Sequence, residues 1–156
     1  MVIYRRANRQ YVAMSEDEVW RFLENQNKVF VAFTMDDGYP HVSPIWFCVD
    51  DHKIYLRTHD YKIKAHLAET GKTCLSTDEG YLYRELRGLI IWGRSRLIKD
   101  EDSLKRINAK LDRKYEKQQW KLGDMPAKWV AQREREKRAF IEVVPERVDS
   151  WDNGKV

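Results

Sequence analysis

The stretch that decides the fold runs over Gly38–Thr58 and reads GYPHVSPIWFCVDDHKIYLRT. Its β-branched and aromatic residues are typical of strands, and DDHK predicts a turn between one strand at His41–Val49 and another at Ile54–Thr58. Pro40 and Pro44 are unexpected in such a segment, because proline has no backbone N–H and keeps the preceding residue extended. We expect Pro44 to split the first strand and to leave neighbouring backbone groups facing a ligand, or else to mark a bulge at a barrel corner.

Length and composition indicate one globular domain. The chain has 156 residues, of which 42% are hydrophobic and 12% aromatic. This is enough apolar surface for one hydrophobic core and leaves little room for a second, so we expect a single domain over residues 1–156. No window approaches the roughly 18 apolar residues of a transmembrane helix, and the N-terminal sequence lacks the pattern of a secretory signal. We therefore expect a cytoplasmic protein that does not enter a membrane.

The charged residues bear on the class of partner, and the cysteines bear on whether the chain has a reactive thiol. The chain carries 29 Lys and Arg against 25 Asp and Glu, a net charge of +4, which mildly favours anionic partners. Both signs alternate along the charged segments, as is typical of solvated helix faces. Cys48 and Cys74 form no C-x-x-C pair, and each lies in an apolar run. They are expected to be buried, inert thiols.

The remaining segments predict a small barrel with peripheral helices. Ser15 and Glu18 form a capping box that begins a helix over Ser15–Leu23. Gly88 and Gly93 interrupt an apolar strand, where glycine marks a bulge or a close backbone approach. Other expected strands are Lys28–Met35 (buried on both sides), Thr73–Thr77, Leu86–Ile98 and the C-terminal RAFIEVVPERVDSW; other expected helices cover residues 60–71, 101–120 and a stretch ending at Arg138. The pattern lacks βαβαβ alternation, so it predicts a mainly β (α+β) fold built as a closed barrel.

Hydrolytic and metal chemistry find no support in the sequence. His41 and Ser43 would share one face of a strand, but no G-x-S-x-G motif accompanies them. The four histidines lack the spacing of metal ligands. There is also no glycine-rich nucleotide-binding loop.

The informative motif is RTHDYKIKAHL, in which a strand ends and a helix begins at Asp60. The free amides of a helix N-terminus carry partial positive charge and suit a phosphate. Thr58 offers a hydroxyl beside this end, and cations are available at Arg57, Lys62 and Lys64. The motif predicts a phosphate site, and the alternative is a solvated basic helix start.

Several segments in order resemble one known family. VFVAFTMDDGYPHVSPIWFCVDDHKIYLRTHDYKIKAHL, LRGLIIWGRSRL and FIEVVPERVDSWD are similar to the FMN-binding split β-barrel family, which includes pyridoxamine 5′-phosphate oxidase and deazaflavin-dependent relatives. The resemblance extends over about residues 15–152. It implies a split barrel that binds FMN and forms a homodimer with cofactor sites at the interface.

The resemblance also assigns cofactor-binding residues. The strand along the flavin ring would comprise His41, Val42, Ser43, Pro44, Ile45 and Trp46. Arg57 and Thr58 fall where the family contacts flavin phosphate and ribityl, Lys62, Ile63 and Lys64 fall at its phosphate ligands, and Gly88 would approach the ring from the partner subunit. Trp46 and Trp92 are candidate aromatic walls, with core packing the preferred interpretation for Trp92. No catalytic residue and no metal ligand is assigned.

Two departures from the oxidase type limit the expected function, and three alternatives to an FMN-dependent oxidoreductase stay open. No histidine follows His66, whereas pyridoxamine 5′-phosphate oxidases carry a histidine-containing motif near the C-terminus, and Ile63 replaces an arginine of the oxidase type. We therefore expect an FMN-dependent oxidoreductase acting on another small molecule, or a deazaflavin (coenzyme F-420)-dependent reductase. Further alternatives are a haem or tetrapyrrole binder, with an axial ligand among the four histidines His41, His52, His59 and His66, and a barrel that binds nucleic acid.

Overall fold

The computed structural model describes residues 1–4, 9–59, 71–118, 124–135 and 138–156. Its strands are β1 Ile3–Tyr4, β2 Val29–Thr34, β3 Pro40–Ile45, β4 Phe47–Asp50, β5 Lys53–His59, β6 Thr73–Glu79, β7 Arg87–Ile98 and β8 Arg138–Asp152. Its helices are α1 Glu16–Glu24, α3 Glu101–Lys114 and α4 Ala127–Arg135, with 3-10 turns η1 Gln10–Val12, η2 Tyr83–Glu85 and η3 Asn153–Lys155.

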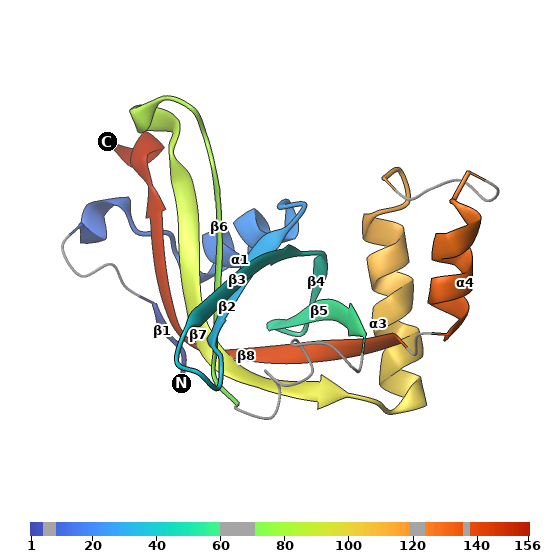
Figure 1. The fold of residues 1–156 in the computed structure, drawn as a ribbon. Coiled ribbons are helices and arrows are strands. Elements are labelled where there is room, and N and C mark those ends of the chain that lie inside the picture. Colours follow the sequence, from blue (N-terminus) through green and yellow to red (C-terminus); the bar gives the residue numbers. More distant parts are fainter. Residues whose placement is uncertain (5–8, 60–70, 119–123, 136–137) are drawn as a thin grey trace.

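The strands form one curled sheet, as the mainly β prediction requires. Its order is β3-β2-β6-β7-β8-β5-β4, and β1 pairs with β8 in parallel. The two longest strands, β7 and β8, pair over the whole of β7 and over Phe140–Asp152 of β8, and Figure 1 shows them bending together partway. Because β8 also pairs with β5, it connects the two halves of the sheet.

Gly93 lies where the register between β7 and β8 shifts, next to Trp92. A Cβ atom at Gly93 would lie only 2.4 Å from the carbonyl oxygen of Val144. The backbones therefore approach too closely for any other residue. This confirms the predicted bulge or close approach at Gly93.

The turn predicted at DDHK is present, and a second turn connects β2 and β3. Gly38 has a φ of +87° and donates its N–H to the carbonyl of Met35 at 2.9 Å, which closes the turn between β2 and β3. Asp51 and His52 both have positive φ in the turn between β4 and β5. Turns of this kind match the twist of the strands that they connect.

The segment predicted as one strand at His41–Val49 is two strands. β3 ends at Ile45, and β4 begins at Phe47, at the opposite end of the sheet order. Trp46 alone connects them, so the covalent chain joins the two ends of the curled sheet. The prediction of one strand is wrong because a continuous apolar run does not reveal a change of partner strand.

The main core lies between α1 and the concave face of the sheet. The capping box is confirmed: the Glu18 N–H donates to Ser15 Oγ at 3.3 Å, and the Ser15 N–H donates to Glu18 Oε2 at 2.7 Å. The helix buries Val19, Phe22 and Leu23 against the strands.

β2 is buried on one face only. Its burial alternates along the strand, and Phe30 remains 39% exposed on the outer face. The expectation of a strand buried on both sides is therefore wrong. The outer face of this part of the sheet has no cover among the described residues.

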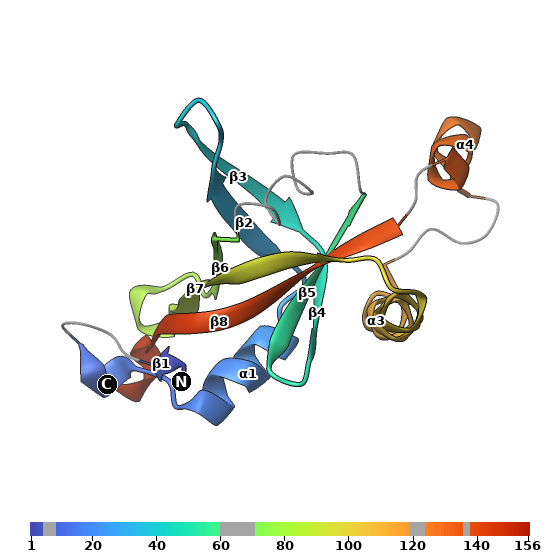
Figure 2. The same ribbon diagram turned by 90° about the horizontal axis from the view of Figure 1, so that it is seen from below.

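A second core lies under α3. Figure 2 shows α3 beside the half of the sheet that contains β4 and β5. Ile107, Leu111 and Tyr115 pack against Cys48 and Phe140. Cys48 is buried as predicted, and burial raises its pKa to about 11, whereas Cys74 is half-buried. None of the helices in the described part of the chain has the length and apolar character that a membrane crossing requires.

The close contact at Gly93 leads to a testable prediction. Gly93→Ala places a methyl group against the β8 backbone, which cannot move without breaking the ladder. We expect the free energy of unfolding to fall by about 1–3 kcal/mol in a denaturant titration.

Arg94→Ala is the control, because Arg94 is an exposed neighbour whose ion pair with Glu146 lies at the surface. It is expected to cost less than about 0.5 kcal/mol. Equal stability of Gly93→Ala and wild type would contradict the assignment.

Candidate functional site

The register of β3 shows where its prolines point. The Met35 N–H donates to the carbonyl of Tyr39 at 2.8 Å, so this pair is a hydrogen-bonded pair of the β2–β3 ladder. Hydrogen-bonded and non-hydrogen-bonded pairs alternate in antiparallel strands. Pro40 and Pro44 therefore occupy non-hydrogen-bonded positions, and their nitrogens face away from β2.

The prolines consequently do not split the strand. β3 is continuous over Pro40–Ile45, so the expectation of an interruption at Pro44 is wrong. β3 is the last strand of the sheet order, and its outer edge would normally present a row of backbone donors. Between the two prolines, only Val42 directs both an N–H and a C=O outward. The edge cannot pair with a further strand in the usual way, but it keeps one donor–acceptor pair.

The side chains of β3 alternate between the two faces of the sheet. His41, Ser43 and Ile45 face the core side, and the His41 ring lies 4.8 Å from the ring of Phe33. Val42 is 60% exposed on the outer face. Ser43 Oγ is buried and has no hydrogen-bond partner among the residues that the structure describes. A buried hydroxyl without a partner costs free energy, so it marks a position where a ligand atom would be favourable.

The end of β5 lies next to the end of β3. The Arg57 N–H donates to the carbonyl of Trp46 at 3.1 Å, which extends the β4–β5 pairing to the residue that follows β3. Pro44 precedes this hydrogen bond by only two residues. Arg57 and the proline-flanked edge are therefore neighbours.

Arg57 and Thr58 project to opposite faces of β5. Thr58 is 3% exposed and faces the core side, together with Leu56. Arg57 is half-buried and shares the face of Tyr55, which packs under α3. One ligand could contact both side chains only where it passes the end of the strand. Lys62, Ile63 and Lys64, and the helix expected over residues 60–71, lie outside the described residues.

Tyr115, at the C-terminal end of α3, holds the junction between β3 and β4 in place. The ring of Trp46 stacks on the ring of Tyr115, with centroids 4.2 Å apart and planes 4° from parallel. The Tyr115 hydroxyl accepts the Phe47 N–H at 3.1 Å and donates to the carbonyl of Asn27 at 2.7 Å. Burial raises the pKa of Tyr115 to about 12. The sequence indicated an apolar face here but gave no sign that this hydroxyl bridges two backbone segments.

The next residue, Lys114, is an unusual neighbour of this junction. Its ammonium lies 3.6 Å from the centroid of the Phe47 ring, and Nζ is buried with no hydrogen-bond partner in the described chain. Burial lowers the pKa of Lys114 to about 8.

The comparison with known families identifies the family of this chain. The sequence profile of the pyridoxamine 5′-phosphate oxidase family matches residues 15–152. The chain belongs to this family. It is a family of flavin-binding proteins, and the split-barrel fold expected from the sequence is confirmed. No curated protein matches the chain.

Solved structures of family-like proteins share the fold. A conserved hypothetical protein from Mycobacterium tuberculosis is 26% identical, with a TM-score of 0.78 over 97% of this chain and 91% of the other. An FAD-binding protein from Mycobacterium smegmatis is 20% identical, with a TM-score of 0.59 over 86% and 93%. An F-420 reductase is 20% identical, with a TM-score of 0.59 over 82% and 93%.

Gly88 lies apart from β3 within the chain. It is a buried residue of β7 that pairs with Asp78 and Trp151. A Cβ at Gly88 would lie 2.3 Å from the indole ring of Trp151, so a side chain of the same protomer explains the glycine. The approach of Gly88 to a flavin in the partner subunit stays a prediction.

Trp92 is not a core residue, contrary to the preferred interpretation. It is half-buried on the outer face of β7, and the Arg147 guanidinium lies 3.7 Å from the centre of its ring. The alternation of β7 places Leu89 and Ile91 in the core and Trp92 outside it.

The histidines are dispersed. His41 contacts Phe33, while His52 lies in the turn between β4 and β5, with its ring 5.1 Å from that of Trp20. His59 ends β5, and His66 lies outside the described residues. Among the residues described, no group of three or more His, Cys, Asp or Glu side chains could hold a metal ion.

The burial of Lys114 leads to a pH prediction. Its pKa is about 8 in the folded protein and 10.5 for an ordinary lysine, so between these values the unfolded chain binds the extra proton. The free energy of unfolding should therefore rise with pH across this window. Lys114→Met keeps the apolar stem, should remove this rise, and should stabilise the protein at pH 7 by about 1–2 kcal/mol.

Lys105→Met, on the exposed face of α3, serves as the control and should leave both stability and its pH dependence unchanged. Denaturant titrations from pH 7 to pH 10.5 provide the measurement. A loss of stability in Lys114→Met at pH 7 would show that the buried cation contributes favourably.

Proposed function

We propose that the protein is an FMN-dependent oxidoreductase acting on a small molecule, with the flavin held along the outer edge of β3. The observation that carries the proposal is that three features lie next to one another. These are the backbone pair of Val42 between two prolines, the unpartnered hydroxyl of Ser43, and the Arg57 corner next to them.

The chemistry of the edge fits a flavin. The pyrimidine end of an isoalloxazine ring presents an N–H between two carbonyl groups. The C=O and N–H of Val42 point the same way and complement such a donor–acceptor pair. Pro40 and Pro44 keep other strands from this edge, so that it stays open for a ring.

The phosphate group would be held at the corner. Arg57 contributes a guanidinium, and Lys62 and Lys64 follow it closely in the sequence. Charge-assisted contacts to phosphate are stronger than neutral hydrogen bonds. Bound FMN supplies hydride transfer through its central ring, while the protein residues bind and orient it.

Coenzyme F-420 is the alternative cofactor. An F-420 reductase shares the fold over 82% of the chain. The net charge of +4 suits the acidic tail of that coenzyme. Oxidation of pyridoxamine 5′-phosphate itself is disfavoured, because no histidine follows His66.

We also propose that the protein is a homodimer and acts in the cytoplasm. On the outer face of the sheet, Phe30 and Val42 are exposed, and Arg147 and Asp149 of β8 each carry a buried side-chain atom without a partner in the described residues. A two-fold interface joins the same surface of both subunits. The compartment is inferred from the cysteines, which are both free.

The phosphate assignment is tested by comparing FMN with riboflavin. Wild type should bind FMN at least about tenfold more tightly than riboflavin, because only FMN has the charged phosphate. Lys62→Ala combined with Lys64→Ala should weaken FMN binding and leave riboflavin binding unchanged. Flavin fluorescence titrations measure both, and absorbance spectra with coenzyme F-420 decide between the cofactors.

The control combines Lys105→Ala with Lys117→Ala, which removes the same charge from exposed positions of α3 and its C-terminal end. It should bind both flavins as wild type does. If the Lys62/Lys64 variant keeps the full preference for FMN, the phosphate lies elsewhere. If wild type binds neither flavin nor coenzyme F-420, the proposed function is wrong.

The dimer is tested at Phe30. Phe30→Lys puts a charge on the outer face and should shift the protein from dimer to monomer in sedimentation equilibrium, because a like charge from each subunit would meet. Val130→Lys on α4 is the matched control, since Val130 is 40% exposed and Phe30 is 39% exposed. A monomeric wild type would refute the proposal.

A further inference from the structure

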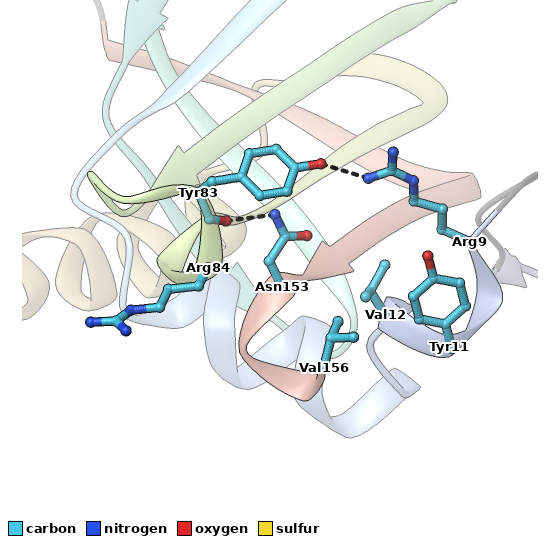
Figure 3. Close-up of a pocket in the computed structure, with 7 residues that line it drawn as sticks. All are labelled: Arg9, Tyr11, Val12, Tyr83, Arg84, Asn153 and Val156. Atoms are coloured by element: carbon cyan, nitrogen blue, oxygen red, sulfur yellow. Dashed lines mark hydrogen bonds between the residues drawn. The ribbon is translucent and has the colours of Figure 1, made fainter.

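A separate pocket lies at the far end of β8, where no flavin contact is proposed. It is an open pocket lined by residues of the 3-10 turns η1, η2 and η3 and their neighbours, with a volume of about 360 Å³. Figure 3 shows its lining residues: Arg9, Tyr11, Val12, Tyr83, Arg84, Asn153 and Val156. The volume lies in the range of small-molecule sites.

The pocket is held by two hydrogen bonds that meet at one residue. Arg9 Nη1 donates to the Tyr83 hydroxyl at 2.7 Å, and Asn153 Nδ2 donates to the Tyr83 carbonyl at 2.7 Å. These bonds connect η1 and η3 to η2, which are distant in sequence. The cavity is therefore formed by the tertiary structure rather than by one loop.

The charged side chains that line the pocket are both positive. The lining contains two arginines and no acidic side chain. Arg9 is exposed, its hydrogen bond goes to a neutral phenol, and it makes no ion pair within the described part of the chain. Figure 3 shows that Arg84 points away from the other lining side chains, so one guanidinium faces the cavity. A single guanidinium matches a singly charged, planar anion, for which arginine offers a fork of N–H donors.

The aromatic side chains that line the pocket favour an anion that carries an aromatic ring. The rings of Tyr11 and Tyr83 are about two thirds exposed, at 66% and 67%. Tyrosine rings bind flat ligands well, because they offer apolar faces at a low cost in conformational entropy. Val12 and Val156 add aliphatic surface.

We propose that this pocket binds a small aromatic carboxylate, with the carboxylate at Arg9 and the ring between Tyr11 and Tyr83. The site does not depend on the proposed flavin function. The flavin corner adjoins Arg57, which pairs with Phe140 near the start of β8, whereas Asn153 follows the end of that strand.

The test uses a matched pair of probes, 1-naphthoate and its neutral amide 1-naphthamide, in isothermal titration calorimetry at low ionic strength. Wild type should bind the carboxylate about tenfold more tightly than the amide, because only the carboxylate is charged. Added salt should reduce this preference. Equal binding of both probes, or no binding of either at millimolar concentration, overturns the proposal.

Variants locate the binding site. Arg9→Gln should abolish the preference for the carboxylate, while Arg84→Gln, whose side chain points away, should retain it. Both positions are exposed, so thermal stability should match wild type. Arg9→Gln should also leave FMN affinity unchanged, which separates this pocket from the flavin site. An Arg9→Gln protein that still prefers naphthoate tenfold overturns the assignment.

Discussion

The hydroxyl of Tyr115 is the contact on which the proposed site depends. The chain passes from one end of the curled sheet to the other through Trp46, and no strand ladder spans that step. Tyr115 holds the Phe47 N–H and the Asn27 carbonyl together, and its ring supports the indole of Trp46. These two bonds fix Phe47, the first residue of β4, to the segment that precedes β2, while the Arg57 N–H bond to Trp46 keeps the end of β3 next to β5.

The role of the prolines in β3 depends on this connection between the two ends of the sheet. An exposed edge strand usually invites pairing with another chain, and proline is one of the residues that prevent it. Here both prolines occupy positions whose nitrogens face outward, so the ladder to β2 stays intact while the outer edge loses two donors. What remains is the peptide pair of Val42, next to a cationic corner. Protection of the edge and the capacity to hold a planar ligand therefore have the same cause.

The buried polar atoms without partners are not scattered at random over the described residues. Ser43 Oγ lies on β3, next to the proposed flavin position, while Arg147 Nε and Asp149 Oδ1 belong to the outer face proposed as the dimer interface. Such atoms are costly when they stay unpaired, so their positions indicate where a cofactor or a second subunit would be stabilising. Lys114 Nζ is the exception, since it lies against the Phe47 ring, where neither is proposed.

The sequence by itself determined the local features. The capping box at Ser15, the turn between β4 and β5, the bulge at Gly93 and the family followed from short-range chemistry, because caps, turns and glycine constraints involve neighbouring residues. Only the tertiary structure decided that β3 and β4 are separate strands, that Trp92 faces outward and that Trp151 covers Gly88. It also brought Arg9, Tyr83 and Asn153 around one cavity. These outcomes depend on which strands pair and on contacts between residues far apart in the chain, and the order of residues does not encode such contacts locally.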